Sequence, residues 1–415
     1  MTSTERRRQF GAYLASLRRR SNRSQRQLAG ALCAASGTQS ITRNEVSRWE
    51  RGDRVPDVWL PALAQVLAVP LTDLEQAAAY ARGDSLARLP GVTPTLADLL
   101  PNGDVLEALA TPGGRRISTT TVEGLAARVH GLRLADDVLS GGDLIGPAFR
   151  ELRCAVRLFQ ESGHSEDTGR ALLVQIGELG QIAGWIASDA GHAEDAERAY
   201  RLGISAARQA GDGVLVAQLA SSLGYHLSNT GREREGLELA EAAVVEAGPD
   251  APAVTRALFM DRVAWAHTRA GEPQPALRAL GEAHAALNTT GGAPAPLWAY
   301  WVSREELEVM DARVFTELRR PLRAVPLLQD VLGRYDATRA REVALYRSWL
   351  AVALADANEP ERAAEEARQV IDASGDLSSE RTAERTRTVL RRLKEYEDVP
   401  EAREVLTDYG HLLLV

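Results

Sequence analysis

Five pairs of small residues recur between residues 184 and 363 of this 415-residue chain, and the two members of each pair are 12 residues apart. The pairs are Gly184/Ala196, Gly224/Gly236, Ala264/Ala276, Ala312/Ala324 and Ala351/Ala363, with successive offsets of 40, 40, 48 and 39 residues. A turn signal separates the members of each pair, at Gly191, Gly231, Gly271, Arg319–Arg320 and Asn358. Two antiparallel helices approach closely only where small residues lie at their crossing. The pattern therefore predicts a stack of helix pairs.

The rest of the chain also has the pattern of helices. Apolar residues recur at spacings of three and four, and alternating strand patterns are lacking. We therefore expect an all-α protein in three parts. Residues 1–82 form a domain of five short helices, residues 83–117 form a linker rich in Gly and Pro, and residues 118–415 form the repeat domain. The linker is expected to contain helical turns near Leu96–Leu100 and Val105–Ala110.

The small positions of residues 170–375 resemble those of a tetratricopeptide array, although the period exceeds its usual 34 residues. This resemblance implies a right-handed α-superhelix with long helices. Residues 118–180 are expected to add one or two helices in front, and residues 379–412 a closing pair, because repeat arrays need capped ends. The apolar residues 412–415 are expected to dock on a partner or a neighbouring helix.

Charge is divided unevenly along the chain. The chain has 49 Lys and Arg residues, of which only Lys394 is a lysine, so the abundance of arginine by itself indicates a coding bias. The chain has a net charge of −8, yet residues 1–56 contain 12 arginines and four acids. A basic head on an acidic body favours a polyanion as partner of the head. On charge alone, an arginine-rich surface without a partner is an equal alternative.

Capping signals mark the helices of the head. Ser24 with Gln27 and Thr42 with Glu45 have capping-box spacing at the starts of the second and third helices, and Thr72 with Glu75 is expected to cap the fifth. The first helix is expected over residues 5–19 and the fourth over residues 57–68. Trp49 is expected in the core.

Two strings in the head, residues 24–29 (SQRQLA) and residues 46–52 (VSRWERG), followed by Val55-Pro56, resemble the Xre/phage-repressor family of helix-turn-helix proteins. The resemblance covers residues 5–82 and implies that the third helix lies in the DNA major groove. Base edges would be read by Arg43, Asn44 and Ser47, because Arg and Asn can bind guanine and adenine in bidentate fashion. Phosphates would be bound by Gln25, Arg26, Arg48, Arg51 and Arg54. The alternative for these arginines is a solvated helix face.

The turn between the second and third helices departs from the family pattern. Residues Cys33–Ser40 lengthen it by about seven residues. The insertion could change the angle of the third helix or contact DNA itself.

A row of aromatic residues follows the repeat period on the first helix of each pair. Trp185, Tyr225 and Trp265 are 40 residues apart. Rows of polar residues lie four positions before and after them, and share one helix face with them. The proposed ligand-binding residues are Gln181, Trp185, Asp189, Ser221, Tyr225, Asn229, Asp261, Trp265 and Arg269. Such a groove suits an extended peptide or a small amphipathic ligand, while ordinary packing or a dimer contact is the alternative.

Other functional classes find little support in the sequence. We expect no catalytic residues, cofactor or metal, because nucleotide-loop, HExxH and CxxC motifs are lacking and His226 and His267 have no catalytic partner at a clear spacing. Apolar runs are too short for a membrane span, and the N-terminus lacks a secretory signal. With two cysteines 121 residues apart, a cytoplasmic protein without disulfides is expected.

A DNA-reading head joined to a repeat domain is similar to bacterial regulators that combine an Xre head with a tetratricopeptide sensor, including quorum-sensing receptors for short peptides. The resemblance implies a homodimer on double-stranded DNA, gated by a signalling peptide or small molecule in the concave groove. A second hypothesis is a constitutive regulator whose repeats serve only dimerisation or protein binding. An enzyme with a DNA-binding head is a third and weaker one.

Overall fold

The computed structural model describes residues 3–84, 89, 96, 100, 116–289, 292–334, 340–374 and 380–413. The chain divides into two compact units, residues 1–93 and residues 94–415, and each is described by itself. Within the described residues the regular structure is helical, with one isolated β-bridge between Arg116 and Gly163 and no strand. The all-α fold expected from the sequence is confirmed. None of the helices in the described ranges is long and apolar enough to cross a membrane.

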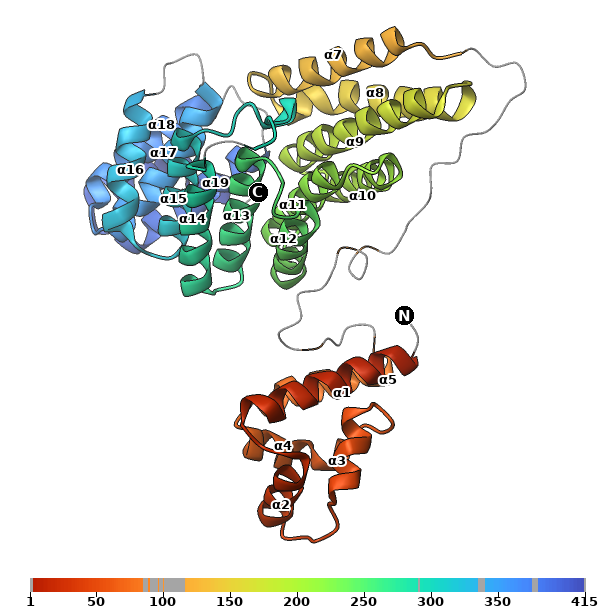
Figure 1. The fold of residues 1–415 in the computed structure, drawn as a ribbon. Coiled ribbons are helices and arrows are strands. Elements are labelled where there is room, and N and C mark those ends of the chain that lie inside the picture. Colours follow the sequence, from red (N-terminus) through yellow and green to blue (C-terminus); the bar gives the residue numbers. More distant parts are fainter. Residues whose placement is uncertain are drawn as a thin grey trace. The chain divides into compact units, whose positions relative to one another are not determined.

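The first unit consists of short helices around one apolar core (Figure 1). They are α1 (Ser3–Arg20), α2 (Gln25–Ser36), α3 (Arg43–Glu50), the 3-10 turn η1 (Asp57–Trp59), α4 (Leu60–Leu67) and α5 (Leu71–Arg82). Phe10, Leu14, Val46 and Trp49 are buried in the core. Ser24 and Gln27 form the predicted reciprocal capping box of α2, and Thr42 Oγ1 accepts the amide of Glu45 at the start of α3.

Three details of the first unit differ from the sequence prediction. The predicted Thr72 cap of the fifth helix is wrong, because the N-cap is Pro70, two residues earlier, and α5 begins at Leu71 with no side-chain cap. The predicted fourth helix is divided into η1 and α4. The inserted residues after Leu32 are not all turn: four of them extend α2 to Ser36, where Gly37 ends it with a φ of 68°. The longer second helix thus absorbs about half of the insertion.

The second unit is a stack of antiparallel helix pairs (Figure 1). The pairs are α9 (Glu166–Asp189) with α10 (Ala193–Ala210), α11 (Gly213–Asn229) with α12 (Glu233–Ala247), α13 (Ala253–Arg269) with α14 (Pro273–Leu287), α15 (Arg304–Glu317) with α16 (Pro321–Arg334), and α17 (Ala340–Asp356) with α18 (Pro360–Ser374). The first helices of successive pairs contact one another and form one layer, while the second helices cover it. Additional helices flank the pairs: α7 (Thr119–Asp136) and α8 (Gly141–Glu161) precede them, and α19 (Glu380–Leu393), η4 (Lys394–Tyr396), α20 (Pro400–Tyr409) and η5 (Gly410–Leu413) follow.

The small residues lie where the paired helices touch, as the spacing predicts. A Cβ on Gly224 would lie 2.8 Å from the carbonyl oxygen of Gly236, and a Cβ on Gly184 would lie 2.7 Å from the Tyr200 ring. The alanines of the later pairs are also buried. Each predicted turn contains one residue of positive φ: Gly191, Gly231, Gly271, Arg319 and Asn358. The same left-handed turn is therefore kept where the sequence has no glycine.

Two segments outside the regular pairs pack onto the second unit. The insertion of the fourth repeat contains the 3-10 turn η2 (Leu297–Ala299), in which Trp298 is buried. Leu96 and Leu100, within the predicted linker, are also buried in the second unit, and Arg208 donates hydrogen bonds to both carbonyl oxygens. Leu89 belongs to the first core. The remaining residues of the predicted linker, apart from 83, 84, 116 and 117, are outside the described residues, and with them the helical turn expected at Val105–Ala110.

The C-terminal residues Leu412 and Leu413 pack against the last core cluster of the second unit, so this part of the apolar end docks within its own chain. Leu414 and Val415 are outside the described residues.

Candidate functional site

Glu50, the last residue of α3, connects three helices of the first unit. Its carboxylate accepts two hydrogen bonds from Arg18 of α1, at 2.6 and 3.1 Å, and one from Gln25 Nε2 at the start of α2, at 2.7 Å. The side chains of Arg18 and Glu50 are only 13% and 8% exposed, so the pair is shielded from solvent. The Glu50 carboxylate raises the pKa of Arg18. Charge-assisted bonds of this kind fix the orientation of α3 relative to α1 and α2.

Two glycines let α1 lie close to the end of α3. A Cβ on Gly11 would meet the backbone of Glu50, and a Cβ on Gly52 would meet the backbone of Arg7. Gly52 also has a φ of 79°, which L side chains rarely adopt. The C-terminal end of α3 is thus held by backbone contact as well as by the Glu50 ion pair.

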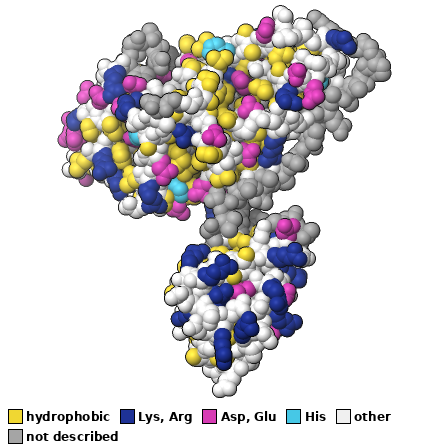
Figure 2. All heavy atoms as spheres, in the orientation of Figure 1, with side chains coloured by type: hydrophobic (Ala, Val, Ile, Leu, Met, Phe, Trp, Pro, Cys, Tyr) yellow, Lys and Arg dark blue, Asp and Glu magenta, His cyan; other side chains and the backbone are white. Residues whose placement is uncertain are grey.

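The residues predicted to contact DNA lie on the outside of α2, α3 and the loop that follows. Arg26, Arg43, Asn44, Arg48, Arg51 and Arg54 are exposed, while Gln25 and Ser47 are half-buried. Arg48 pairs with Glu45 and Arg51 with Asp53, whereas Gln25 is held by Glu50. Figure 2 shows many arginine side chains on the visible face of this unit, which contains no lysine. The α3 face therefore presents positive charge together with one amide and one hydroxyl.

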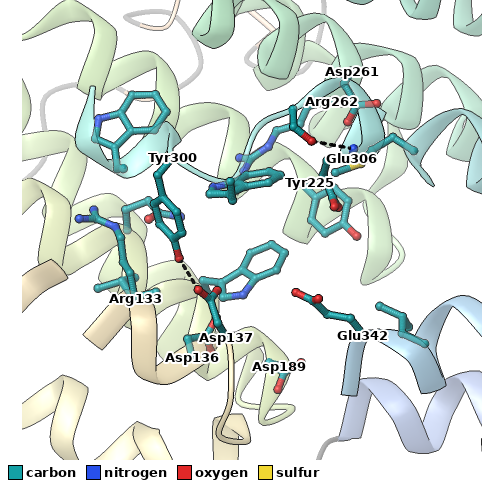
Figure 3. Close-up of a pocket in the computed structure, with 18 of the residues that line it drawn as sticks. Arg133, Asp136, Asp137, Asp189, Tyr225, Asp261, Arg262, Tyr300, Glu306 and Glu342 are labelled. Atoms are coloured by element: carbon teal, nitrogen blue, oxygen red, sulfur yellow. Dashed lines mark hydrogen bonds between the residues drawn. The ribbon is translucent and has the colours of Figure 1, made fainter. Parts of the chain in front are cut away.

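The second unit encloses a cavity of about 440 Å³. Its wall is built from residues of α7, α9, α11, α13, α15, α17 and α19 and from the η2 segment, so the first layer of the helix stack surrounds it (Figure 3). Six acidic residues line it: Asp136, Asp137, Asp189, Asp261, Glu306 and Glu342. Three arginines, Arg133, Arg262 and Arg313, and six aromatic residues, Trp185, Tyr225, Trp298, Tyr300, Trp301 and Tyr346, complete most of the surface.

The predicted aromatic row forms a continuous series of ring contacts. Ring centroids lie 5.9 Å apart for Trp185 and Tyr225, 6.1 Å for Tyr225 and Trp265, and 5.8 Å for Trp265 and Trp349. The first two residues of the row line the cavity. Trp265 is buried behind them, with its Nε1 donating to Asn229.

Arg313 was missed by the sequence analysis and occupies the next position of the aromatic row. It follows the small residue Ala312, just as Trp185 follows Gly184, so the repeat offset of 48 residues could have identified it. Its guanidinium lies 4.6 Å from the Trp265 ring centroid and 5.4 Å from that of Trp349, and it donates a 2.6 Å hydrogen bond to Tyr225 Oη. A buried cation thus sits among the rings.

The polar rows predicted beside the aromatic residues divide into two groups. Gln181, Asp189 and Asp261 line the cavity. Ser221, Asn229 and Arg269 are not among the residues that line it. Ser221 accepts from Arg262, Asn229 binds the Tyr225 carbonyl and the Trp265 indole, and Arg269 donates to the Ser228 carbonyl. These three residues hold neighbouring helices together instead, because the rows rotate away from the cavity along the stack.

Two residues of the cavity wall, Asp261 and Gln218, bury polar side chains almost completely. Asp261 is 2% exposed, and burial raises its pKa to about 7, against the opposing effect of Arg313. Gln218 is also 2% exposed, and its Oε1 has no hydrogen-bond donor among the described residues. Gln218 Oε1 is thus a buried acceptor without a described donor, whereas at Asp261 burial penalises the charged form.

The η2 segment closes one side of the cavity. Tyr300 donates a 2.8 Å hydrogen bond from its hydroxyl to Asp137 at the end of α7, and Figure 3 shows this bond across the cavity wall. The Tyr300 ring also meets His130 edge-on, with centroids 5.9 Å apart. The inserted segment of the fourth repeat is therefore tied to α7.

The structure brings one Ser–His pair together that the sequence spacing did not reveal. Ser188 Oγ lies 2.9 Å from His226 Nδ1, and burial lowers the pKa of His226. Neither residue lines the cavity. The contact links α9 to α11 away from the groups described above.

Comparison with protein families places residues 9–77 in a helix-turn-helix domain. The match covers α2 and α3, and thus the strings that suggested a DNA-binding head. A search among curated proteins found none similar to the chain. The first unit is therefore a helix-turn-helix domain, which supports a DNA-binding regulator.

Proposed function

We propose that the chain is a sequence-specific, homodimeric transcriptional regulator of the Xre type, in which a small molecule bound in the cavity of the second unit controls DNA binding. The single observation that carries the regulatory role is the helix-turn-helix domain with its exposed, arginine-rich α3 face. In this proposal residues 1–82 bind DNA, residues 83–117 link the two domains, and residues 118–415 form a tetratricopeptide-like sensor domain.

The residue roles at DNA follow from exposure and chemistry. Arg43 and Asn44, in the first turn of α3, are exposed and carry the side chains best suited to guanine and adenine edges. Ser47 lies one turn further on the same helix. Arg26, Arg48, Arg51 and Arg54 surround this face and are assigned to phosphates. Gln25 is assigned to a phosphate as well, with Glu50 holding its side chain in place.

The cavity supports a small ligand more than a long peptide. Its volume of about 440 Å³ is within the range typical of small-molecule sites. The η2 segment, tied to α7 by Tyr300, narrows the groove along which an extended peptide would run. A ligand there controls DNA binding only if it binds two states of the protein with different affinity.

The test of DNA reading is selection of bound genomic fragments by the purified full chain at about 150 mM salt, where non-specific phosphate binding is weakened. The Arg43→Ala/Asn44→Ala variant is compared with Arg19→Ala, which removes the same charge from an exposed site on α1. We expect a two-fold symmetric motif that Arg19→Ala retains and the double variant loses. Identical selection by all three proteins would refute the assignment of α3.

A second candidate is a constitutive regulator whose repeats serve only dimerisation. Trp265 and Trp349 are buried against each other, so this part of the aromatic row serves packing and not ligand binding. This alternative predicts operator affinity that no small molecule alters.

A further inference from the structure

We propose that the outer face of α8 binds the phosphate backbone of DNA beside the operator. The contact surface is the α8 stripe, which consists of the three exposed arginines Arg150, Arg153 and Arg157. This second DNA contact rests on the proposed function, because the helix-turn-helix domain first brings the chain to DNA. The contact carries no sequence information, and it adds affinity and salt dependence.

The α8 stripe lies on one face of a long amphipathic helix. Spacings of three and four residues place its members on neighbouring turns. At a rise of about 1.5 Å per residue, the first and the last member are about 10 Å apart along the helix. The opposite face of α8 is buried and includes Leu144, Leu152 and Phe159. The stripe therefore has a rigid support and faces outward.

The arginines of the stripe have no partner of their own. Within the described residues, none of the three forms an ion pair or a hydrogen bond. Glu151 lies between them in sequence, but its carboxylate accepts from Arg128 of α7 at 3.0 Å. Near the ends of α8, Asp143 accepts the hydroxyl of Ser140, and Glu161 is the last residue of the helix. The middle of the helix therefore presents three unneutralised positive charges.

A free basic stripe is unusual for its surroundings, because the body of the chain is acidic. The whole chain has a net charge of −8 and residues 1–56 have +8, so the remaining residues have −16. On α10, by contrast, Arg198 binds Asp195 and Arg201 binds Glu197, each at 2.6 Å. A polyanion is repelled by an acidic body in general and is attracted to the α8 face.

Phosphate groups of DNA match the stripe in number and chemistry. Guanidinium groups bind phosphate oxygens in bidentate fashion. Each DNA strand has one phosphate per about 3.4 Å of helix axis, so a stripe about 10 Å long meets about three phosphates. A second copy of the chain fits less well, since carboxylates such as Asp195 and Glu197 are already bound to its own arginines.

A stripe of three arginines is sufficient because the two units belong to one chain. Once the helix-turn-helix domain is bound, the second contact is intramolecular and benefits from a high effective concentration. Contacts too weak to bind DNA alone therefore add to the affinity of the whole protein.

The test measures DNA affinity of the full chain by fluorescence anisotropy across a salt series. One duplex contains only the motif obtained by genomic selection, and a second extends it by about 20 base pairs on each side. For wild type, the slope of log affinity against log salt concentration should be steeper on the long duplex. The expected increase is about 2.7 units for each protomer that contacts the flanking DNA.

The variant Arg150→Ala/Arg153→Ala/Arg157→Ala should lose this increase and keep the wild-type slope on the short duplex. Arg153→Ala alone should remove about one unit. Equal wild-type slopes on both duplexes, or an increase that the triple variant retains, would overturn the proposal.

A matched control separates the stripe from net charge. Arg198→Ala/Arg234→Ala/Arg278→Ala removes three exposed arginines from α10, α12 and α14 and should retain the increase on the long duplex. If both triple variants lose it equally, general charge and not the α8 stripe causes the effect. Sedimentation velocity tests a protein partner: a stripe variant that loses the homodimer and keeps the wild-type slopes would assign α8 to a second copy and overturn DNA binding.

Failure of this inference can be distinguished from failure of the proposed function. If wild type and the stripe variant select the same motif and have the same slopes, the regulator stands and only the α8 contact is refuted. If no motif is selected, sequence-specific reading fails. The stripe is then tested on a long duplex of arbitrary sequence, where the stripe variant should still bind more weakly than the matched control, and equal binding would refute it.

Discussion

Replacing Asp261 with asparagine should stabilise the protein at alkaline pH and stabilise it much less at acidic pH. The carboxyl group is 2% exposed, and its pKa rises from 3.8 to about 7 because burial penalises the charged form. Arg313 and Arg262 oppose this shift, while Asp311 and Glu306 add to it. Asparagine has nearly the same shape as the protonated acid and cannot ionise, so it removes the penalty without opening a cavity.

The unfolding free energy depends on pH because the folded and unfolded states bind the Asp261 proton with different affinity. Between about pH 4 and pH 7 the folded state holds the Asp261 proton more tightly than the unfolded state, so the free energy of unfolding falls as the pH rises through this window. A shift of about 3 pKa units corresponds to roughly 4 kcal/mol when fully expressed, near pH 8. At pH 5 less than half of this penalty is present.

Urea unfolding of wild type and Asp261→Asn at pH 5 and pH 8 measures the effect. The difference in unfolding free energy between the two proteins should grow by about 2 to 3 kcal/mol in favour of the variant over that range. Asp250→Asn, which removes an exposed carboxylate outside the cavity, controls for the loss of one charge. A difference between wild type and variant that is the same at both pH values would refute the burial argument for Asp261.

Three further perturbations test the remaining parts of the structure. Glu50→Ala leaves the shielded Arg18 and Gln25 without their acceptor and should lower the unfolding free energy by about 3 kcal/mol in urea titrations. The control, Glu45→Ala, removes the exposed pair with Arg48 and should lower it by under about 1 kcal/mol. Equal losses in the two variants would contradict the role of Glu50. Gly236→Ala places a Cβ 2.8 Å from the Ser228 amide nitrogen and should destabilise the protein by about 2 kcal/mol or more. The control, Gly281→Ala on α14, adds a Cβ with nothing within 4 Å and should stabilise the protein by about 0.5–1 kcal/mol. Calorimetry that finds the same sign for both variants would exclude close packing at the α11–α12 crossing. Arg54→Ala should lower the slope of log operator affinity against log salt concentration by about one unit and leave the selected motif unchanged. A changed motif in binding selection would assign Arg54 to bases instead.

The repeat architecture was largely predictable because its cause is local and periodic. Helices that cross closely need small residues, and a chain that repeats the crossing must repeat those residues, so Gly224/Gly236 and the other pairs reveal both the helices and their partners. The turns were found for the same reason, down to Arg319 and Asn358, which adopt the left-handed conformation without being glycine.

The cavity could be predicted only in part, because sequence period identifies a face of each helix but not how far each face rotates along the stack. Trp185, Tyr225, Gln181, Asp189 and Asp261 share the cavity wall as expected. The contributions of α7, of α19 and of the η2 segment, among them Asp137, Tyr300 and Thr382, come from outside the periodic region. No spacing rule connects these residues, since the contact of Tyr300 with Asp137 spans 163 positions.

That same non-periodic wall explains how occupancy of the cavity could be communicated. The residues that line it extend from α7 to α19 near the end of the stack. A ligand that contacts helices from both ends of this range therefore acts on the packing of the whole stack. The change in DNA affinity is limited to the difference in ligand binding energy between the two states. Because burial penalises the charged form of Asp261 near neutral pH, a ligand that removes this penalty has such a difference available only if the second state does not already relieve the buried charge. Asp261→Asn, which removes the charge permanently, should thus weaken the response of operator affinity to a ligand of the cavity even though the variant still binds DNA.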